Sequence, residues 1–267
     1  MSILSCEGVR LSVDQAGSGP ALVLVHGAWS DRSTWDPVFL PLSKRFHVIR
    51  YDRRGYGQSQ RSGAEPKVHV DDLLALILTL RLSNVILVGN SFGGLVAMRT
   101  AREDGRLVRF VVAHEPPLLG LFRNEEQPDP IVERALSALS QTQAAVRDGD
   151  HILAAQIYVE GLASSPGTFR YLPPEIKEGF IANAGSFLAD AEDLQNAEFT
   201  SESLKKIGQR LLLTHGERTS PFLKLIVERL RNAHPGLAFH SFAAGGHVPH
   251  QSCPEAFVAK ILEVCGA

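Results

Sequence analysis

The sequence is poor in cysteine and has no long apolar run. Only Cys6, Cys253 and Cys265 occur among 267 residues, and their spacing matches no metal-binding pattern. We therefore expect reduced thiols and no bound metal. No apolar stretch approaches the roughly 18 residues of a membrane span, and the N-terminus lacks the basic and apolar regions of a signal peptide. These absences predict a soluble, cytoplasmic protein.

Neither sign of charge is in excess. Lys and Arg number 27, Asp and Glu number 29, and the formal net charge is −2. Proteins that bind nucleic acid or anionic membranes usually carry a basic surface, so we expect neither as a partner. A chain of this length, 44% hydrophobic, is long enough for one α/β core with an insertion.

Short aliphatic runs alternate with helical stretches along most of the chain. Unbroken apolar runs of about five residues are typical of parallel strands that are covered on both faces. Their alternation with helices predicts a doubly wound α/β sheet. The predicted strands are 9–13, 21–25, 48–51, 85–88, 108–113, 210–214 and 237–242, and the predicted core helices are 68–80, 92–102, 221–233 and 254–264.

This alternation stops between residues 117 and 206, where the sequence predicts helices only. Residues 131–147 and 152–162 have helical periodicity, and a third helix is expected from the prolines at 173–174 to residue 184. We predict that 117–206 form a helical cap over the carboxyl edge of the sheet, where open α/β sheets bind ligands. Residues 1–116 and 207–267 would then form the core.

A G-x-S-x-G pattern is the strongest chemical signal. Gly89, Ser91 and Gly93 directly follow the apolar strand 85–88 and open a helix. A nucleophile on such a strained strand–turn–helix junction needs small neighbours, which explains the glycines. Ser91 is therefore the candidate nucleophile, and a simple tight turn is the alternative.

Three further motifs follow the order found in a known superfamily. They are His-Gly-Ala-Trp at 26–29, Asp-Arg-Arg-Gly-Tyr-Gly-Gln-Ser at 52–59 and Gly-Gly-His at 245–247. Together with the serine motif they make the chain resemble the α/β-hydrolase superfamily over nearly its whole length. That resemblance implies an eight-stranded, mostly parallel sheet with an inserted helical cap, and no cofactor.

The resemblance also implies roles for individual residues. His247 would be the base that activates Ser91, because an unassisted hydroxyl is a poor nucleophile at neutral pH. The backbone N–H groups of Ala28 and Phe92 would form the oxyanion hole. Trp29 would either line the acyl pocket or pack beneath the cap.

The third member of the catalytic triad departs from the usual family pattern. Most members carry an aspartate where this chain has Thr219, whose side chain cannot balance the charge of an imidazolium. Glu217 in the same loop and Glu115 at the end of strand 108–113 are the two candidates. The placement of Glu115 resembles that of the acid in zearalenone-type lactonases, so we predict Glu115. Glu217, or a merely local capping role for Glu115, is the alternative.

For several other residues the sequence allows both a structural and a functional interpretation. We expect His26 to brace its loop, His250 to be a pocket or surface residue, and Asp52 and Arg54 to stabilise their turn. The aromatic residues of the predicted cap either face the substrate or form the core of the cap. They are Phe122, Tyr158, Phe169, Tyr171, Phe180 and Phe187.

The resemblance implies a cofactor-independent serine hydrolase that cleaves a small, mostly apolar carboxylic ester or lactone. A serine nucleophile separates the chain from haloalkane dehalogenases and epoxide hydrolases, which use a carboxylate there. The alternatives are a carbon–carbon bond hydrolase, a perhydrolase and a signal receptor with little turnover. Carbon–carbon hydrolases usually retain the aspartate that Thr219 replaces. The sequence does not specify an oligomeric state.

Overall fold

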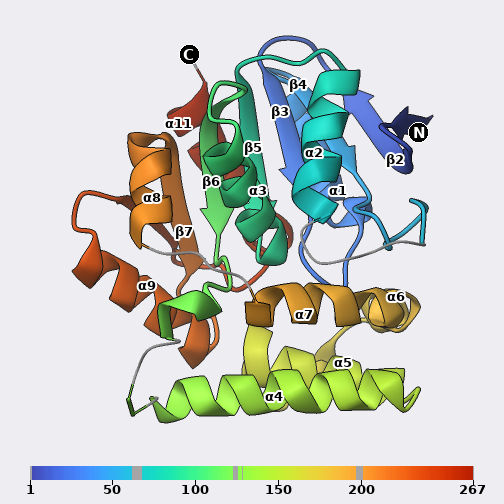
Figure 1. Ribbon diagram of the computed structural model, residues 1–267, viewed down its shortest axis with the longest axis vertical. Helices are drawn as coiled ribbons and strands as arrows, with labels where there is room; N and C mark the ends of the chain where they lie inside the picture. The colour runs from blue at the N-terminus through green and yellow to red at the C-terminus, as the bar shows by residue number, and fades with distance from the viewer. Residues whose placement is uncertain (1, 62–67, 123–125, 128, 197–200, 267) are drawn as a thin grey trace.

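A mixed sheet of eight strands forms the centre of the molecule (Figure 1). The computed structural model describes residues 2–61, 68–122, 126–127, 129–196 and 201–266. The strand order is β1-β2-β4-β3-β5-β6-β7-β8, with β1–β2 and β2–β4 antiparallel and the other pairs parallel. This confirms the predicted doubly wound, mostly parallel sheet. The strands are β1 (Ser2–Cys6), β2 (Val9–Ala16), β3 (Ala21–Val25), β4 (His47–Tyr51), β5 (Val85–Asn90), β6 (Val108–His114), β7 (Leu211–Gly216) and β8 (Ala238–Phe242).

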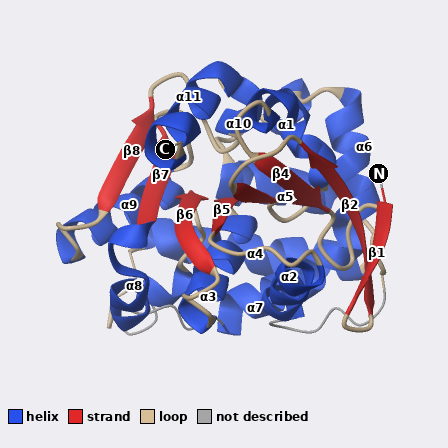
Figure 2. Ribbon diagram, turned by 90° about the horizontal axis from the view of Figure 1, so that it is seen from above, coloured by secondary structure: helices blue, strands red, loops and turns tan. Residues whose placement is uncertain are grey.

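Helices cover both faces of the sheet (Figure 2). Along β5, Val85 and Leu87 point into one hydrophobic cluster, and Ile86 and Val88 point into the other. Burial on both faces is the reason that the strands are unbroken apolar runs. One cluster contains side chains of α1 (Asp36–Ser43) and α11 (Pro254–Cys265), and the other contains side chains of α2 (Val68–Thr79), α3 (Phe92–Glu103), α8 (Ser201–Ile207) and α9 (Pro221–Ala233).

Helices inserted between β6 and β7 lie across the carboxyl end of the sheet (Figure 1). We call four of them the inserted helices: α4 (Pro130–Arg147), α5 (His151–Tyr158), α6 (Pro174–Asn183) and α7 (Phe187–Asn196). A π-helical turn, Val159–Ala163, continues α5. By contrast, α8 lies beside α3 at the sheet. The remaining short helices are α10 (Pro249–Ser252) and the 3-10 turns Arg32–Trp35, Leu119–Phe122, Phe169–Tyr171, Ala184–Ser186 and Gly208–Arg210.

The sequence analysis did not predict β1 and α1. β1 is an edge strand whose side chains are mostly exposed, so it has no continuous apolar run. α1 contains Pro37 in its first turn and Pro41 in its interior, and an interior proline usually argues against a helix. Both elements are formed because tertiary packing overrides these local signals.

Gly93 lets α3 begin directly against β3. A Cβ atom at Gly93 would lie 2.1 Å from the carbonyl oxygen of Val25 and 2.5 Å from that of His26. We predict that Gly93→Ala lowers the free energy of unfolding by about 1–3 kcal/mol, because strand backbone cannot yield easily. The measurement is urea unfolding followed by circular dichroism.

Gly179 provides a matched control, since it also lies in a helix but has open space where a Cβ would be placed. Gly179→Ala should leave stability unchanged or raise it by up to about 1 kcal/mol. Equal losses in the two variants would show that close packing at Gly93 is not the cause.

Candidate active site

Ser91 occupies a strained turn between β5 and α3. Its backbone angles, φ 52° and ψ −123°, lie outside the regions that L-residues normally adopt. A Cβ at Gly89 would lie 2.3 Å from the carbonyl oxygen of Gly93, so this position requires glycine. The Ser91 N–H donates to the carbonyl oxygen of His114 at 2.8 Å. This hydrogen bond extends the β5–β6 ladder and supports the strained residue.

The same ladder brings Glu115 beside the serine. Asn90 pairs with His114 and His114 with Thr214, so Ser91 and Glu115 are the next residues of adjacent strands. The Glu115 N–H donates to the carbonyl oxygen of Thr214 at 2.9 Å, and Glu115 also has a positive φ of 46°. Both candidate catalytic residues therefore leave the sheet at its carboxyl edge.

Glu115 is hydrogen-bonded to His247. Nδ1 of His247 donates to Oε2 of Glu115 at 2.6 Å. Oε1 accepts from the N–H of Gly216 at 2.8 Å, and Oε2 also accepts from the hydroxyl of Thr219 at 2.7 Å. Burial alone would raise the pKa of Glu115, but His114, His247 and the Gly216 N–H hold it at about 2. The buried carboxylate is therefore charged at neutral pH.

The structure separates the two acid candidates. Glu217 is exposed and accepts a hydrogen bond from the hydroxyl of Ser241, on the outer side of β8. Only Glu115 of the two is bonded to His247. The hydroxyl of Thr219, the residue that the sequence analysis compared with the usual aspartate, donates to the carboxylate of Glu115. The sequence analysis interpreted Thr219 as the absence of the usual acid and did not predict its hydrogen bond to Glu115.

Two side chains hold the loop that carries His247. Nδ2 of Asn90 donates to the carbonyl oxygen of His247 at 2.7 Å, and Nε2 of His114 donates to that of Gly246 at 3.1 Å. Nδ1 of His114 can then accept from the hydroxyl of Thr214 at 2.9 Å. Burial lowers the pKa of His114 to about 4, so the ring is uncharged at neutral pH. Sequence reasoning singled out neither residue for this role.

Ser91 and His247 line the same narrow cavity, whose volume is about 20 Å³. Both predicted oxyanion-hole residues, Ala28 and Phe92, also line it, and Phe92 is the first residue of α3, where N–H groups point out of the helix end. The other lining residues come from β-strand ends, α9 and the inserted segment: Pro117, Leu119, Leu139, Tyr158, Leu162, Ala163, Leu194, Phe222 and Leu223. Apart from Ser91, His247 and Tyr158, the described lining residues are apolar.

Tyr158 is the one residue among the six predicted cap aromatics that lies on the described wall of this cavity. Its hydroxyl interacts with Ser91, and burial raises the pKa of Tyr158 to about 12, so the phenol stays protonated. Nothing in the local sequence distinguishes it from the other five. It is the last residue of α5, directly before the π-helical turn.

Trp29 packs beneath the inserted helices, which is one of its two predicted positions. Its ring centroid lies 4.8 Å from that of Phe187, 5.5 Å from that of Tyr158 and 5.9 Å from that of Phe180. It is 2% exposed and is not among the described residues that line the cavity. Its described ring contacts are thus with the inserted helices, and contact with substrate stays a prediction.

The remaining residues make contacts within the fold. His250, which we expected in a pocket or on the surface, is instead fully buried, hydrogen-bonded to Thr34 at 2.9 Å and packed on Trp35 with ring centroids 4.1 Å apart. Asp52 accepts from the backbone N–H of Gln58 at 2.8 Å, which holds its turn. The side chain of Arg54 forms an ion pair outside that turn, with Asp72 of α2.

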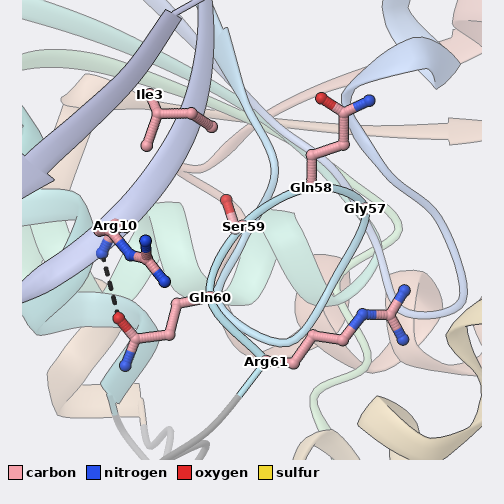
Figure 3. A pocket seen from close by; sticks show the side chains of 7 residues that line it. All are labelled: Ile3, Arg10, Gly57, Gln58, Ser59, Gln60 and Arg61. Carbon is pink, nitrogen blue, oxygen red and sulfur yellow. Dashed lines mark hydrogen bonds between the residues drawn. The ribbon is translucent and has the colours of Figure 1, made fainter.

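A larger depression of about 590 Å³ lies elsewhere, beside β1 and β2 (Figure 3). Its described lining residues include Arg10, Gln60 and Arg61, together with Ser59. The hydroxyl of Ser59 donates to the carbonyl oxygen of Asp52 at 2.6 Å and accepts from the N–H of Ser12, so it is committed to the turn. Because no described base faces that hydroxyl, we assign the chemistry to the small cavity at Ser91.

In the described part of the chain, no group of three or more His, Cys, Asp or Glu side chains is placed to hold a metal ion. No helix in the described ranges is both long and apolar enough to cross a bilayer.

Comparison with known proteins identifies the family. The family model described as "Alpha/beta hydrolase family" matches residues 22–260. The chain belongs to this family. Over 107 residues it is 38% identical to the 2-(acetamidomethylene)succinate hydrolase of Mesorhizobium japonicum, an alignment that spans 39% of this chain and 38% of that protein.

Two solved structures share the fold over nearly the whole chain. A thermophilic esterase from Thermogutta terrifontis is 23% identical with a TM-score of 0.76, and the match covers 98% of this chain and 97% of that one. The enol-lactonase from Burkholderia xenovorans is 22% identical with a TM-score of 0.69 and 98% coverage of both chains. At this identity the likeness establishes the α/β-hydrolase fold.

The depressed pKa of Glu115 makes stability depend on pH. Its pKa is about 2 in the folded protein against an ordinary 4.5, so its ionised form stabilises the fold above pH 4.5, and that contribution is lost as the pH falls toward 2. We predict that wild type exceeds Glu115→Gln in unfolding free energy above pH 5. The difference should shrink by about 3 kcal/mol on acidification to pH 2.

The measurement is urea unfolding of both proteins at a series of pH values. The sign follows because the unfolded state binds the Glu115 proton at higher pH than the folded state. A difference that stays constant over this range would mean that Glu115 is not stabilised as a carboxylate.

Proposed function

We propose that this protein is a cofactor-independent serine hydrolase that cleaves a small, uncharged carboxylic ester or lactone through an acyl-enzyme. The observation that carries the proposal is the 2.6 Å hydrogen bond between His247 and the buried Glu115, with His247 and Ser91 on the wall of one apolar cavity. An oriented imidazole next to a serine on a strained elbow is the arrangement that activates a hydroxyl.

The proposed acylation begins at Ser91. Its Oγ attacks the substrate carbonyl carbon while Nε2 of His247 takes the hydroxyl proton, because Nδ1 is committed to Glu115. The charged Glu115 stabilises the resulting imidazolium. The oxyanion is held by the N–H groups of Ala28 and Phe92, each contributing about 3–4 kcal/mol in comparable sites.

Collapse of the tetrahedral intermediate expels the alkoxide, which takes the proton from His247. In a lactone this alcohol stays attached to the acyl chain, and in a linear ester it departs. His247 then deprotonates a water molecule, which attacks the acyl-enzyme. When the second tetrahedral intermediate breaks its bond to Oγ of Ser91, Oγ takes the proton back from His247 and the acid is released. No step requires a metal or an organic cofactor.

The wall of the cavity supports an uncharged substrate. Its described side chains include no lysine or arginine, so a substrate carboxylate would be buried without a cationic partner, which is costly. The relative from Mesorhizobium is named for a succinate, an acidic substrate. We therefore propose neutral esters and lactones as small-molecule substrates of this chain, with neither nucleic acid nor membrane as a partner.

The inserted helices take the role of a cap in this proposal. Leu139 of α4, Tyr158 of α5 and Leu194 of α7 supply wall residues opposite the sheet. Helices α4 to α7, within the segment 117–206 that the sequence predicts as the cap, would thus choose the substrate, while the core performs the chemistry.

The first test is turnover of chromogenic esters and lactones with short to medium acyl chains. Wild type should show sustained turnover, and Ser91→Ala should reduce it by at least about 10³-fold. Esters whose acyl chain ends in a methyl group should be preferred to matched esters that end in a carboxylate, because the cavity offers no countercharge.

Several outcomes would overturn the proposal. Activity that survives Ser91→Ala would exclude the serine mechanism. A single burst of one product per enzyme, followed by no turnover, would favour a receptor. Turnover confined to carbon–carbon cleavage substrates or to peracid formation would favour those reactions on the same scaffold.

A second test concerns the acid. Glu115→Ala should lower kcat/KM by about 10³- to 10⁴-fold, because His247 loses both its orientation and its counterion. Glu217→Ala is the matched control, since Glu217 is exposed and bonded to Ser241, and it should change kcat/KM by less than about twofold. Circular dichroism checks that both variants fold. The reverse pattern would assign the acid to Glu217.

A further inference from the structure

The side chain of Arg53 forms hydrogen bonds with the candidate oxyanion loop, residues 26–29. Its Nε donates to the carbonyl oxygen of His26 at 3.1 Å, and Nη2 donates to that of Gly27 at 3.0 Å. These are the two peptide units immediately before Ala28. The guanidinium is fully buried, so neither bond competes with water. Two charge-assisted bonds to consecutive carbonyl groups fix the orientation of this loop.

Arg53 also contacts the other half of the candidate oxyanion hole. The centre of its guanidinium lies 4.7 Å from the ring centroid of Phe92. Its backbone N–H donates to Nε2 of His26 at 2.9 Å, while Nδ1 of His26 donates to the carbonyl oxygen of Gly27 at 2.8 Å. Burial, and then the charge of Arg53, hold the pKa of His26 well below its ordinary value, so this ring is neutral.

The far side of Arg53 binds a carboxylate that comes from the inserted helices. Nη1 and Nη2 donate to Oδ1 and Oδ2 of Asp190 in α7 at 3.0 and 2.7 Å. Asp190 also accepts from the hydroxyl of Tyr56 at 2.6 Å and from Nε2 of His69 at 3.0 Å. Burial alone would raise the pKa of Asp190, but Arg53 and His69 hold it far below its ordinary value. The ion pair is thus charged and has no contact with solvent.

A buried ion pair contributes little net stability, because the desolvation of two charges offsets their attraction. What it does provide is a fixed geometry. We infer that the Arg53–Asp190 pair is a positioning device that couples the inserted helix α7 to the oxyanion loop, so that the loop is correctly placed only when α7 is docked. This inference rests on the proposed function, in which Ala28 and Phe92 bind the oxyanion.

A second contact of α7 acts on the same loop. Phe187, one turn before Asp190, packs on Trp29 with ring centroids 4.8 Å apart, and Trp29 directly follows Ala28. Trp29 has a positive φ of 62°, which a bulky residue adopts only under external constraint. The helix therefore holds the loop on both sides of Ala28, through Arg53 before it and Trp29 after it.

The chain contains a matched control pair. Arg99 of α3 donates to Asp193 of α7 at 2.6 Å, and both side chains are nearly buried. Like the first pair, it joins the core to α7, but Arg99 donates to Asp193 and not to the carbonyl groups of His26 and Gly27. Asp190→Asn and Asp193→Asn thus each leave a buried arginine without its carboxylate, and only the first should disturb the oxyanion loop.

The experiment compares these two variants with wild type in the full chain. Asp190→Asn should lower kcat for the best neutral ester by about 10- to 100-fold, because a small misplacement of an oxyanion donor has effects of this size. The factor lost in kcat should exceed the change in KM, since the oxyanion forms only in the transition state. Asp193→Asn should leave kcat within about threefold of wild type, although both variants lose thermal stability.

Amide hydrogen exchange gives a readout that does not depend on activity. Peptides covering residues 26–30 should exchange faster in Asp190→Asn than in wild type or Asp193→Asn. If wild type hydrolyses no ester, the proposed function fails, but this exchange pattern still decides whether α7 holds the loop. Equal kcat losses with equal exchange in the two variants would overturn the inference, as would wild-type kcat and exchange in Asp190→Asn.

Arg53→Lys guards against a failure of Asp190→Asn to fold. Lysine keeps a positive charge beside Asp190, but it has no planar fork to reach the carboxylate and two carbonyl groups together. It should reproduce the loss of kcat and the faster exchange of residues 26–30 with a smaller loss of thermal stability. Wild-type values of both in this variant would contradict a positioning role for Arg53.

Discussion

The parallel register of β5, β6 and β7 is the constraint on which the site depends. Asn90 lies opposite His114, and His114 lies opposite Thr214, so the residues that follow emerge side by side at one edge. Ser91 and Glu115 both adopt positive φ at that edge, a conformation that costs on the order of 1–3 kcal/mol each. A slip of one residue in the pairing would turn the side chains of β6 to the opposite face. The buried sheet therefore supports the strain that the chemistry requires.

Buried charged side chains are paired with one another, and the described wall of the cavity at Ser91 is nearly free of them. Three buried charged groups have partners within the protein: Glu115 is hydrogen-bonded to His247, Arg53 is paired with Asp190, and Arg99 is paired with Asp193. The cavity wall between them is nearly apolar over its described residues. Such a wall lowers the local dielectric constant, which strengthens every hydrogen bond to a developing oxyanion. Paired buried groups therefore surround a cavity whose described wall carries no fixed charge apart from the candidate catalytic groups.

The sequence predicts those features that depend on neighbours in the chain. The apolar strands, the glycines around Ser91 and the position of His247 all follow from local patterns. The Arg53–Asp190 pair, by contrast, joins residues 137 positions apart, and the bond from Asn90 to His247 spans 157 positions. No short pattern identifies such partners. Thr219 illustrates the difference. Its local sequence context indicates only that the usual acid is missing, whereas its hydroxyl donates a hydrogen bond to Glu115, 104 positions away.

The placement of the acid on β6 has a consequence for how the site is assembled. Ser91 and Glu115 are joined by one crossover through α3, so a single strand–helix–strand unit carries both the nucleophile and the acid. Contacts within such a unit are short in sequence and form early in folding more readily than distant ones. Only the base must then be delivered from the end of the chain. Of the three candidate catalytic groups, two thus lie at the ends of one strand–helix–strand unit, and only His247 comes from the C-terminal segment.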